Sequence, residues 1–303
     1  MTDYNSERLA TLSSHRVLYY HVIANTFPEI YPLGISVKAF EKQLIWLKRL
    51  GYNFIPLSKA VEGYSFKNGK SVSITLDDGF ACNFEALMRI RKSYSLHPSL
   101  FLIGKCLDNS ALAWNHKLLI MKGKISAQVL NGYIAELVPG ANLQTLFAKI
   151  SMASKDAITD ALWEQCMQQT QEEYLAEKQP FFSSEQLAEL LDSGAEIAAH
   201  SFSHPDFSRL SLAKATSELD SCFDAFETRN LPYNMHFAFP YGLRCSPKME
   251  YHLMEQVGLD VTFGTRFCAG DNTQDKLRWQ RQSMEGGTIG NLLEFWIKPG
   301  FRG

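Results

Sequence analysis

The period of the hydrophobic positions changes repeatedly along the chain between that of strands and that of helices. Short apolar runs, typical of buried strands, occupy residues 17–20, 53–56, 71–76, 100–103, 196–199, 235–239 and 260–263. Segments with apolar residues three and four apart, typical of amphipathic helices, occupy residues 36–51, 84–90, 183–194, 212–227 and 246–258. This alternation predicts parallel strands joined by helical crossovers.

The fold class that this order favours is α/β, with a (β/α) barrel as the first choice. A doubly wound open sheet is the alternative, but no Gly-x-Gly-x-x-Gly sequence follows any predicted strand. The alternation stops at residues 107–180, where we expect a helical insertion within a single domain spanning residues 1–303. In either fold the carboxyl ends of the strands meet on one face, where active sites lie.

Composition excludes several classes of protein. With 30 Lys and Arg against 32 Asp and Glu, the net charge of −2 gives no reason to expect nucleic acid or an anionic membrane as a partner. No apolar run approaches the roughly 20 residues of a transmembrane helix. Residues 1–14 are polar and lack the features of a secretory signal, and the six cysteines form no Cys-x-x-Cys pair. We therefore expect a cytoplasmic protein with reduced thiols.

Polar residues that could carry chemistry follow the predicted strands. They are His21, Asp77, Asp78, His200, His204 and the Pro240-Tyr241 turn. The remaining histidines have no comparable partners in the sequence and are interpreted as ordinary core or surface residues: His15, His97, His116, His236 and His252. A single His-x-x-x-His pair is a weak signal, but two imidazoles and one carboxylate together supply three ligands to a divalent ion and leave positions open for substrate.

Such an open site is typical of a hydrolase. A divalent ion lowers the pKa of a water that it binds from ~15.7 to about 7. A neighbouring carboxylate can then act as general base near neutral pH, although it could not deprotonate bulk water. Adjacent aspartates at one strand end therefore predict a division of labour, in which one binds the ion and the other accepts the proton.

Three short motifs resemble those of a known family. Residues 75–80, Thr-Leu-Asp-Asp-Gly-Phe, resemble the Thr-Phe-Asp-Asp-Gly motif of the polysaccharide deacetylases with the NodB homology domain, carbohydrate esterase 4. Residues 200–204, His-Ser-Phe-Ser-His, resemble its His-Ser/Thr-x-x-His motif, and residues 239–242 resemble its Pro-Tyr/Phe-Gly turn. The resemblance covers roughly residues 16–103 and 181–284 and leaves the insertion out.

The resemblance implies a fold, a cofactor and the role of each matched residue. The fold would be an irregular (β/α) barrel of the NodB type. Asp78, His200 and His204 would bind a divalent metal, with Zn²⁺ as the first choice and Ni²⁺, Co²⁺ or Fe²⁺ as alternatives. Asp77 would be the catalytic base, and the backbone N–H of Tyr241 would help to stabilise the oxyanion.

Two departures from the family pattern concern the residues around the metal. Ala238 stands where the family has an arginine that orients the base, and Arg281, with Arg278 second, is the candidate replacement. The late Leu-His motif that carries the general acid is absent, since no histidine follows His252. Residues 18–21, Leu-Tyr-Tyr-His, resemble the Tyr-His motif of circularly rearranged members, which makes His21 the candidate general acid.

The function implied is removal of an N-acetyl group from an amino sugar, in a polysaccharide or in a saccharide precursor for a surface polysaccharide. Two alternatives stay open at this point. A catalytically inactive relative could bind sugar without hydrolysing it, and a deformylase or another amidase could use the same residues on a different N-acyl group. The sequence does not identify the sugar, its carrier or the oligomeric state.

Overall fold

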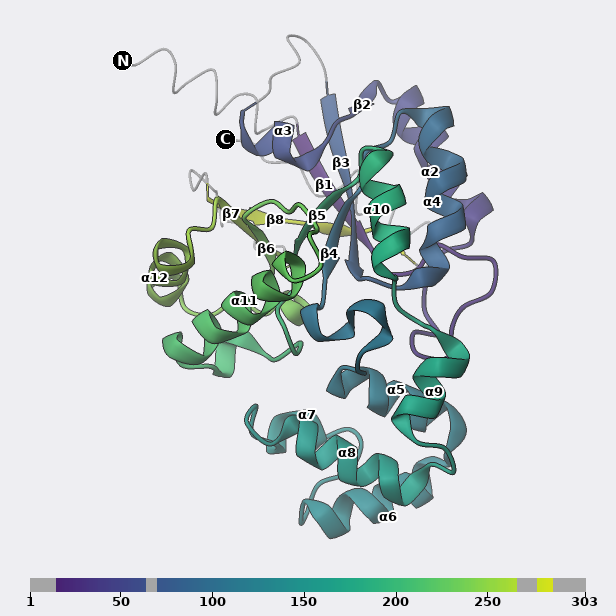
Figure 1. Ribbon diagram of the computed structural model, residues 1–303, viewed down its shortest axis with the longest axis vertical. Helices are drawn as coiled ribbons and strands as arrows, with labels where there is room; N and C mark the ends of the chain where they lie inside the picture. The colour runs from purple at the N-terminus through teal and green to yellow at the C-terminus, as the bar shows by residue number, and fades with distance from the viewer. Residues whose placement is uncertain (1–14, 64–69, 266–276, 286–303) are drawn as a thin grey trace.

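A sheet of parallel strands, nearly closed into a barrel, is the centre of the molecule (Figure 1). The computed structural model describes residues 15–63, 70–265 and 277–285. The strands are β1 (His15–Tyr20), β2 (Tyr52–Phe54), β3 (Lys70–Asp78), β4 (Ser99–Leu102), β5 (Glu196–Ala199), β6 (His236–Ala238), β7 (Val261–Gly264), β8 (Arg278–Gln280) and β9 (Gln282–Ser283). This architecture confirms the predicted (β/α) barrel over the open sheet.

The order of the strands explains how the sheet closes. It runs β8-β7-β6-β5-β4-β3-β1-β9, and β2 pairs with the beginning of β3. Thr262 of β7 pairs with Arg278 of β8, and Leu18 of β1 pairs with Gln282 of β9. Since only Arg281 separates β8 from β9, one short segment joins both edges of the sheet. Its short strands carry no apolar periodicity, and the sequence did not predict them.

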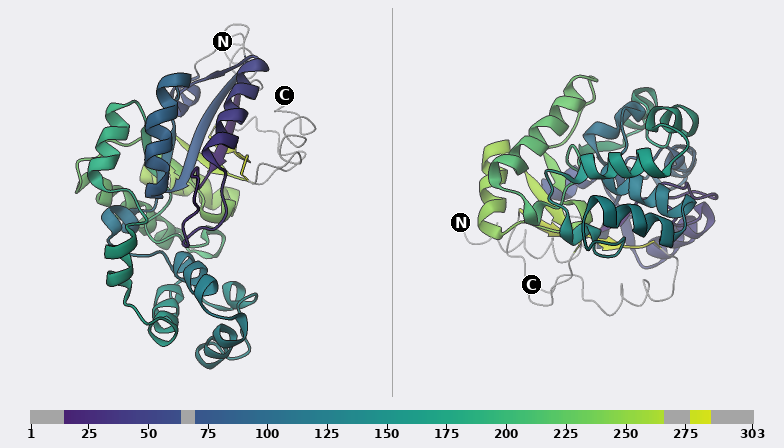
Figure 2. Two further views of the ribbon diagram at one scale, coloured as in Figure 1. Left: turned by 90° about the vertical axis from the view of Figure 1, so that its right-hand side faces the viewer. Right: turned by 90° about the horizontal axis from the view of Figure 1, so that it is seen from below.

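Helices surround the sheet, as the two further views also show (Figure 2). Those of the barrel are α2 (Val37–Arg49), α3 (Leu57–Val61), α4 (Phe84–Tyr94), α10 (Ser184–Asp192), α11 (Leu212–Glu227) and α12 (Pro247–Val257). The Ser36 hydroxyl caps α2 by accepting a hydrogen bond from Ala39 N–H, and Ser183 and Gln186 form the predicted capping box at α10. These local signals were therefore interpreted correctly.

The segment between β4 and β5 is mostly helical, as expected for residues 107–180. Its helices are α5 (Trp114–Lys124), α6 (Ala127–Leu137), α7 (Leu146–Lys149), α8 (Lys155–Cys166) and α9 (Gln171–Lys178). Their apolar side chains form a second hydrophobic cluster together with barrel residues such as Val22, Phe80 and Ile103, and the helices gather at the end of the barrel to which the carboxyl end of β3 points (Figure 1). We call this segment, residues 107–180, the helical insertion. It stands against the face on which the site residues were predicted.

The barrel strands are buried on both faces. In β3, Val72, Ile74 and Leu76 pack in the large cluster under the outer helices. The alternate residues Ser73, Thr75 and Asp77 are buried as well. Buried polar side chains need hydrogen-bond or charged partners inside the protein. The last residue of this row, Asp77, is the candidate catalytic base.

Two further points follow from the described residues. Every helix among them is too short or too polar to traverse a lipid bilayer. Cys82, Cys106, Cys166, Cys222 and Cys245 are free thiols. Cys268 and the polar start, residues 1–14, lie outside the described residues.

Candidate active site

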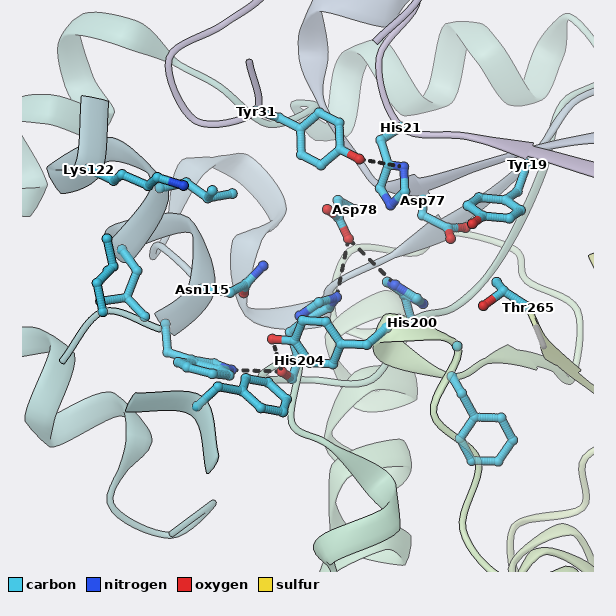
Figure 3. Close-up of a pocket in the computed structure, with 18 residues that line it drawn as sticks. Tyr19, His21, Tyr31, Asp77, Asp78, Asn115, Lys122, His200, His204 and Thr265 are labelled. Carbon is cyan, nitrogen blue, oxygen red and sulfur yellow. Dashed lines mark hydrogen bonds and ion pairs between the residues drawn. The ribbon is translucent and has the colours of Figure 1, made fainter. Parts of the chain in front are cut away.

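The three candidate metal ligands converge from two strand ends. Asp78 is the last residue of β3, and His200 directly follows β5. Asp78 Oδ1 lies 3.5 Å from His200 Nε2 and 3.4 Å from His204 Nε2. Figure 3 shows both imidazoles pointing at this carboxylate. The ligating atoms lie within 4.8 Å of one another, and all three side chains are buried.

The backbone at these residues adopts a conformation that side chains disfavour. Asp78 has φ 69°, Ser201 69°, His204 57° and Tyr241 58°. Left-handed non-glycine residues are uncommon and cost free energy, and they concentrate at functional sites. Asp78, His204 and Tyr241 line one cavity and Ser201 follows His200, so their conformations indicate that the rest of the fold holds this geometry.

The donor set fits a divalent cation. Asp78 Oδ1 is buried without a hydrogen-bond partner among the described residues, an arrangement that is costly unless an ion satisfies it. His200 Nδ1 lies 2.8 Å from the carbonyl oxygen of Ala238. The ring must donate through Nδ1 there, which leaves the Nε2 lone pair free to coordinate. Burial also lowers the pKa of both His200 and His204, so both rings are in the neutral form that binds metal.

The second aspartate is paired with an arginine. Arg281 donates from Nη1 to Asp77 Oδ1 over 2.6 Å and from Nη2 to Asp77 Oδ2 over 2.7 Å. The guanidinium also contacts the hydroxyl of Thr75 and lies against the rings of Tyr19 and Phe101. Burial opposes ionisation of Asp77, but the charge and hydrogen bonds of Arg281, together with the nearby imidazoles of His200 and His21, hold the carboxyl pKa below its usual value. Asp77 is therefore an ionised, oriented acceptor.

Arg278, the second candidate for this contact, lies elsewhere. Its Nε donates to the buried carboxylate of Glu250 on α12 over 2.9 Å. The arginine that contacts Asp77 is Arg281, in the segment that closes the barrel. Arg281 reaches Asp77 from the position between β8 and β9, whereas Ala238, at the place of the arginine in the motif that this chain resembles, ends β6.

His21 is held on the opposite side of Asp78 from the two candidate ligand histidines, as Figure 3 shows. Its Nδ1 lies 2.8 Å from Glu285 Oε2, and its ring stacks on Tyr31 at 4.6 Å. Asn83 donates to the His21 carbonyl and accepts from Ile23 N–H, which fixes the chain after β1. Burial alone would lower the pKa of His21, but Glu285 raises it to about 9. His21 therefore carries a proton at neutral pH.

A cavity of about 430 Å³ joins these groups. The barrel supplies His21, Asp77, Asp78, His200, His204 and Tyr241, and the helical insertion supplies Trp114, Asn115, Leu118, Lys122, Leu143 and Phe147. The Tyr241 ring stands 4.6 Å from the His204 ring. A Cβ on the neighbouring Gly242 would lie 1.7 Å from Thr265 Oγ1, so this turn requires glycine.

Two residues that contact the candidate site residues were not predicted from the sequence. His116, interpreted as an ordinary residue, is fully buried on α5 with its Nε2 3.2 Å from Asp78 Oδ2. Glu285 followed no predicted element and contacts His21 across 264 residues of chain. Neither contact leaves a local pattern, so no signal in the sequence could have identified them.

Comparison with known proteins identifies one matching family and several solved structures with a similar fold. A family model described as polysaccharide deacetylase matches residues 66–261. IcaB from Ammonifex degensii is similar with a TM-score of 0.60 at 16% identity, covering 95% of this chain and 97% of that one. Streptococcus pyogenes deacetylase PplD in complex with acetate has a TM-score of 0.57 at 16% identity, covering 92% and 96%.

A de-N-acetylase from Aggregatibacter actinomycetemcomitans is also similar, with a TM-score of 0.54 at 16% identity, covering 88% of this chain and 93% of that one. At these identities the likeness shows a shared fold. No curated protein matches the chain.

Proposed function

Because the chain belongs to the polysaccharide deacetylase family, we propose that it is a metal-dependent carbohydrate N-deacetylase. The observation that carries the proposal is the buried set of Asp78, His200 and His204, with an unpartnered carboxylate oxygen between two neutral imidazoles. A second buried carboxylate, that of Asp77, lines the same cavity. Metal-catalysed hydrolysis of an amide requires protein ligands on one side of the ion and a base beside them.

Asp78, His200 and His204 would hold the ion, with Zn²⁺ as the first choice. When bound, it would supply Lewis-acid chemistry, lowering the pKa of water and polarising the amide carbonyl. Three protein ligands are typical of catalytic rather than structural zinc sites. The same three ligands would also accept Ni²⁺, Co²⁺ or Fe²⁺.

Asp77 is proposed as the general base. Its carboxylate accepts the proton of the attacking water while the water oxygen forms a bond to the acyl carbon. Arg281 keeps Asp77 ionised and fixes the direction of its oxygens through two hydrogen bonds. A weakly basic carboxylate would suffice here because a bound ion would lower the pKa of the water at the same site.

His21 is proposed as the general acid. It is protonated at neutral pH because of Glu285, and it would give that proton to the amide nitrogen as the C–N bond breaks. The backbone N–H of Tyr241 is proposed to stabilise the oxyanion, a contribution worth on the order of 10²–10³ in rate in other enzymes. The products are acetate and a free amino sugar.

The proposed substrate is an N-acetylated amino sugar in a polysaccharide or in a saccharide precursor of a surface polysaccharide. The helical insertion adds apolar and polar side chains to the cavity wall, which supports a sugar ring packed on apolar groups and oriented by a few polar ones. Action on a cytoplasmic precursor stays a prediction.

The proposal is tested by measuring metal content together with the acid released from acetylated and formylated amino sugars. We expect acetate and free amine in equal amounts from the metal-loaded protein, and neither from the metal-stripped protein. Formate in place of acetate would identify a deformylase. Full metal occupancy without release of any acid would identify a sugar-binding relative. The Asp77→Asn variant, which keeps the ligands, is the matched control for contaminating activity.

A further inference from the structure

Asp78 uses its two carboxylate oxygens differently. Oδ1 faces His200 Nε2 and His204 Nε2 and has no hydrogen-bond partner among the described residues. Oδ2 faces His116 Nε2 at 3.2 Å. An ionised carboxylate can only accept, so His116 must donate its Nε2–H to Oδ2. This bond keeps Oδ2 occupied and leaves Oδ1 directed at the other two imidazoles.

The His116 side chain is closely packed, which restricts its rotation. It is fully buried, and its ring lies 5.2 Å from the ring of Phe80 and 5.6 Å from that of Phe181. Its ring centroid also lies 6.0 Å from that of His204, with an angle of 29° between the ring planes. Its Nδ1 has no hydrogen-bond partner in the described part of the chain. Among the described residues, the hydrogen bond of the buried His116 side chain is therefore the one to Asp78.

The helical insertion that carries His116 is attached to the ligands at further points. The indole N–H of Trp114, also on α5, donates to the carbonyl of His204 over 2.8 Å. Buried Lys155 on α8 donates to the hydroxyl of Ser203 over 2.8 Å. At the end of the insertion, Ala81 N–H donates to the carbonyl of Pro180, beside the turn that follows Asp78. The insertion thus supports both ligand-bearing loops of the barrel.

We propose that His116 is a positioning residue of the metal centre, through which the helical insertion fixes Asp78 as a ligand by one oxygen. This inference rests on the proposed function, since it takes Asp78, His200 and His204 as the ligands. Groups that hydrogen-bond to a metal ligand typically contribute 10- to 100-fold in metal affinity or activity. We expect His116 to contribute about that much to the affinity for Zn²⁺.

The test measures Zn²⁺ affinity by competition with a chromophoric chelator, using the full-length protein and three variants. His116→Phe keeps an aromatic ring at this position but removes the donor. His116→Gln retains an amide N–H that can reach Oδ2. His236→Phe removes another buried imidazole, on β6, and is the matched control. The absorption spectrum of the Co²⁺-loaded protein reports the coordination at the same time.

The inference predicts that His116→Phe binds Zn²⁺ about 10- to 100-fold more weakly and changes the Co²⁺ spectrum. His116→Gln should recover most of the affinity, and His236→Phe should bind as the wild type does. Equal affinity of His116→Phe and wild type, with a lower melting temperature, would overturn the inference and leave the proposed function standing. Absence of Zn²⁺ binding by the wild type would overturn both.

Discussion

Asp77 and Asp78 are neighbours in the sequence and both are buried, yet their environments differ. Asp77 makes two hydrogen bonds with Arg281, so its charge is compensated by the protein itself. Oδ1 of Asp78 faces the imidazoles of His200 and His204, which are neutral because burial lowers their pKa. This buried oxygen therefore has no cationic partner on that side, which is the condition that a metal ion would satisfy.

The first prediction separates the roles of base and ligand. Asp77→Asn should lower kcat by about 10²- to 10⁴-fold, the usual contribution of a general base, while the ion stays bound. His200→Ala should lose both turnover and metal. Rates and metal content measured on the same preparations, with circular dichroism to check folding, provide the test. If Asp77→Asn lost the metal and His200→Ala retained it, the two assignments would be reversed.

The second prediction concerns the pair of His21 and Glu285 in the metal-free protein. The pKa of His21 is raised from 6.5 to about 9, so the pair stabilises the fold fully below pH 6.5 and ceases to do so as the pH rises through about 9. Glu285→Gln should therefore reduce the free energy of unfolding more at low pH than at high pH. Urea unfolding at about pH 6 and about pH 10 measures the difference.

In the metal-loaded enzyme, the same substitution should move the alkaline limb of kcat/KM to lower pH, because His21 would lose its proton more readily. Glu255→Gln, an exposed change on α12, is the control. An unchanged alkaline limb in Glu285→Gln would mean that His21 is not the acid whose ionisation limits the reaction.

At the scale of elements, the segment from β8 to Glu285 brings two positioning residues to the site. It carries Arg281 between β8 and β9, and Glu285 just after β9. Its anchorage depends on Glu250 of α12, which is fully buried and pairs with Arg278 of β8 and with Arg244. Arg244 also donates to the carbonyl of Trp279. The positions of the proposed base and the proposed acid thus depend on an ion-pair network outside the cavity.

The third prediction follows from this network. Glu250→Ala should lower the free energy of unfolding by roughly 3–5 kcal/mol, the usual cost of removing one partner from a buried pair. Its kcat should also fall, because Arg281 would be less well placed. Denaturant unfolding and initial rates provide the measurement, with Glu255→Ala on the exposed side of α12 as control. Equal stability of the two variants would contradict this role for Glu250.

Elements whose signals are local could be predicted from the sequence, and those defined by distant partners could not. The helix after Ser36 was predictable because its cap and apolar spacing lie within one segment. Strands β8 and β9 are short, and pairing with β7 and β1 across the barrel defines them. For the same reason the motifs indicated Asp78, His200 and His204, but the contacts of His116 and Glu285 are visible only in the folded chain.

At the scale of the whole molecule, the barrel and the helical insertion build the cavity together. The barrel supplies the candidate ligands, base and acid, while α5, α7 and the segment between α6 and α7 add a wall of apolar and polar side chains. Contacts from Trp114 and Lys155 tie that wall to the loop of residues 200–204. Changes in the insertion should therefore affect both the substrate range and the metal centre.

The central claim is that Asp78, His200 and His204 bind one catalytic ion. The most direct measurement is the anomalous scattering of a crystal of the full-length protein soaked with Zn²⁺. We predict a single strong peak about 2.0–2.2 Å from Asp78 Oδ1, His200 Nε2 and His204 Nε2. A peak bound elsewhere, with Asp78 outside coordination distance of the ion, would contradict the account.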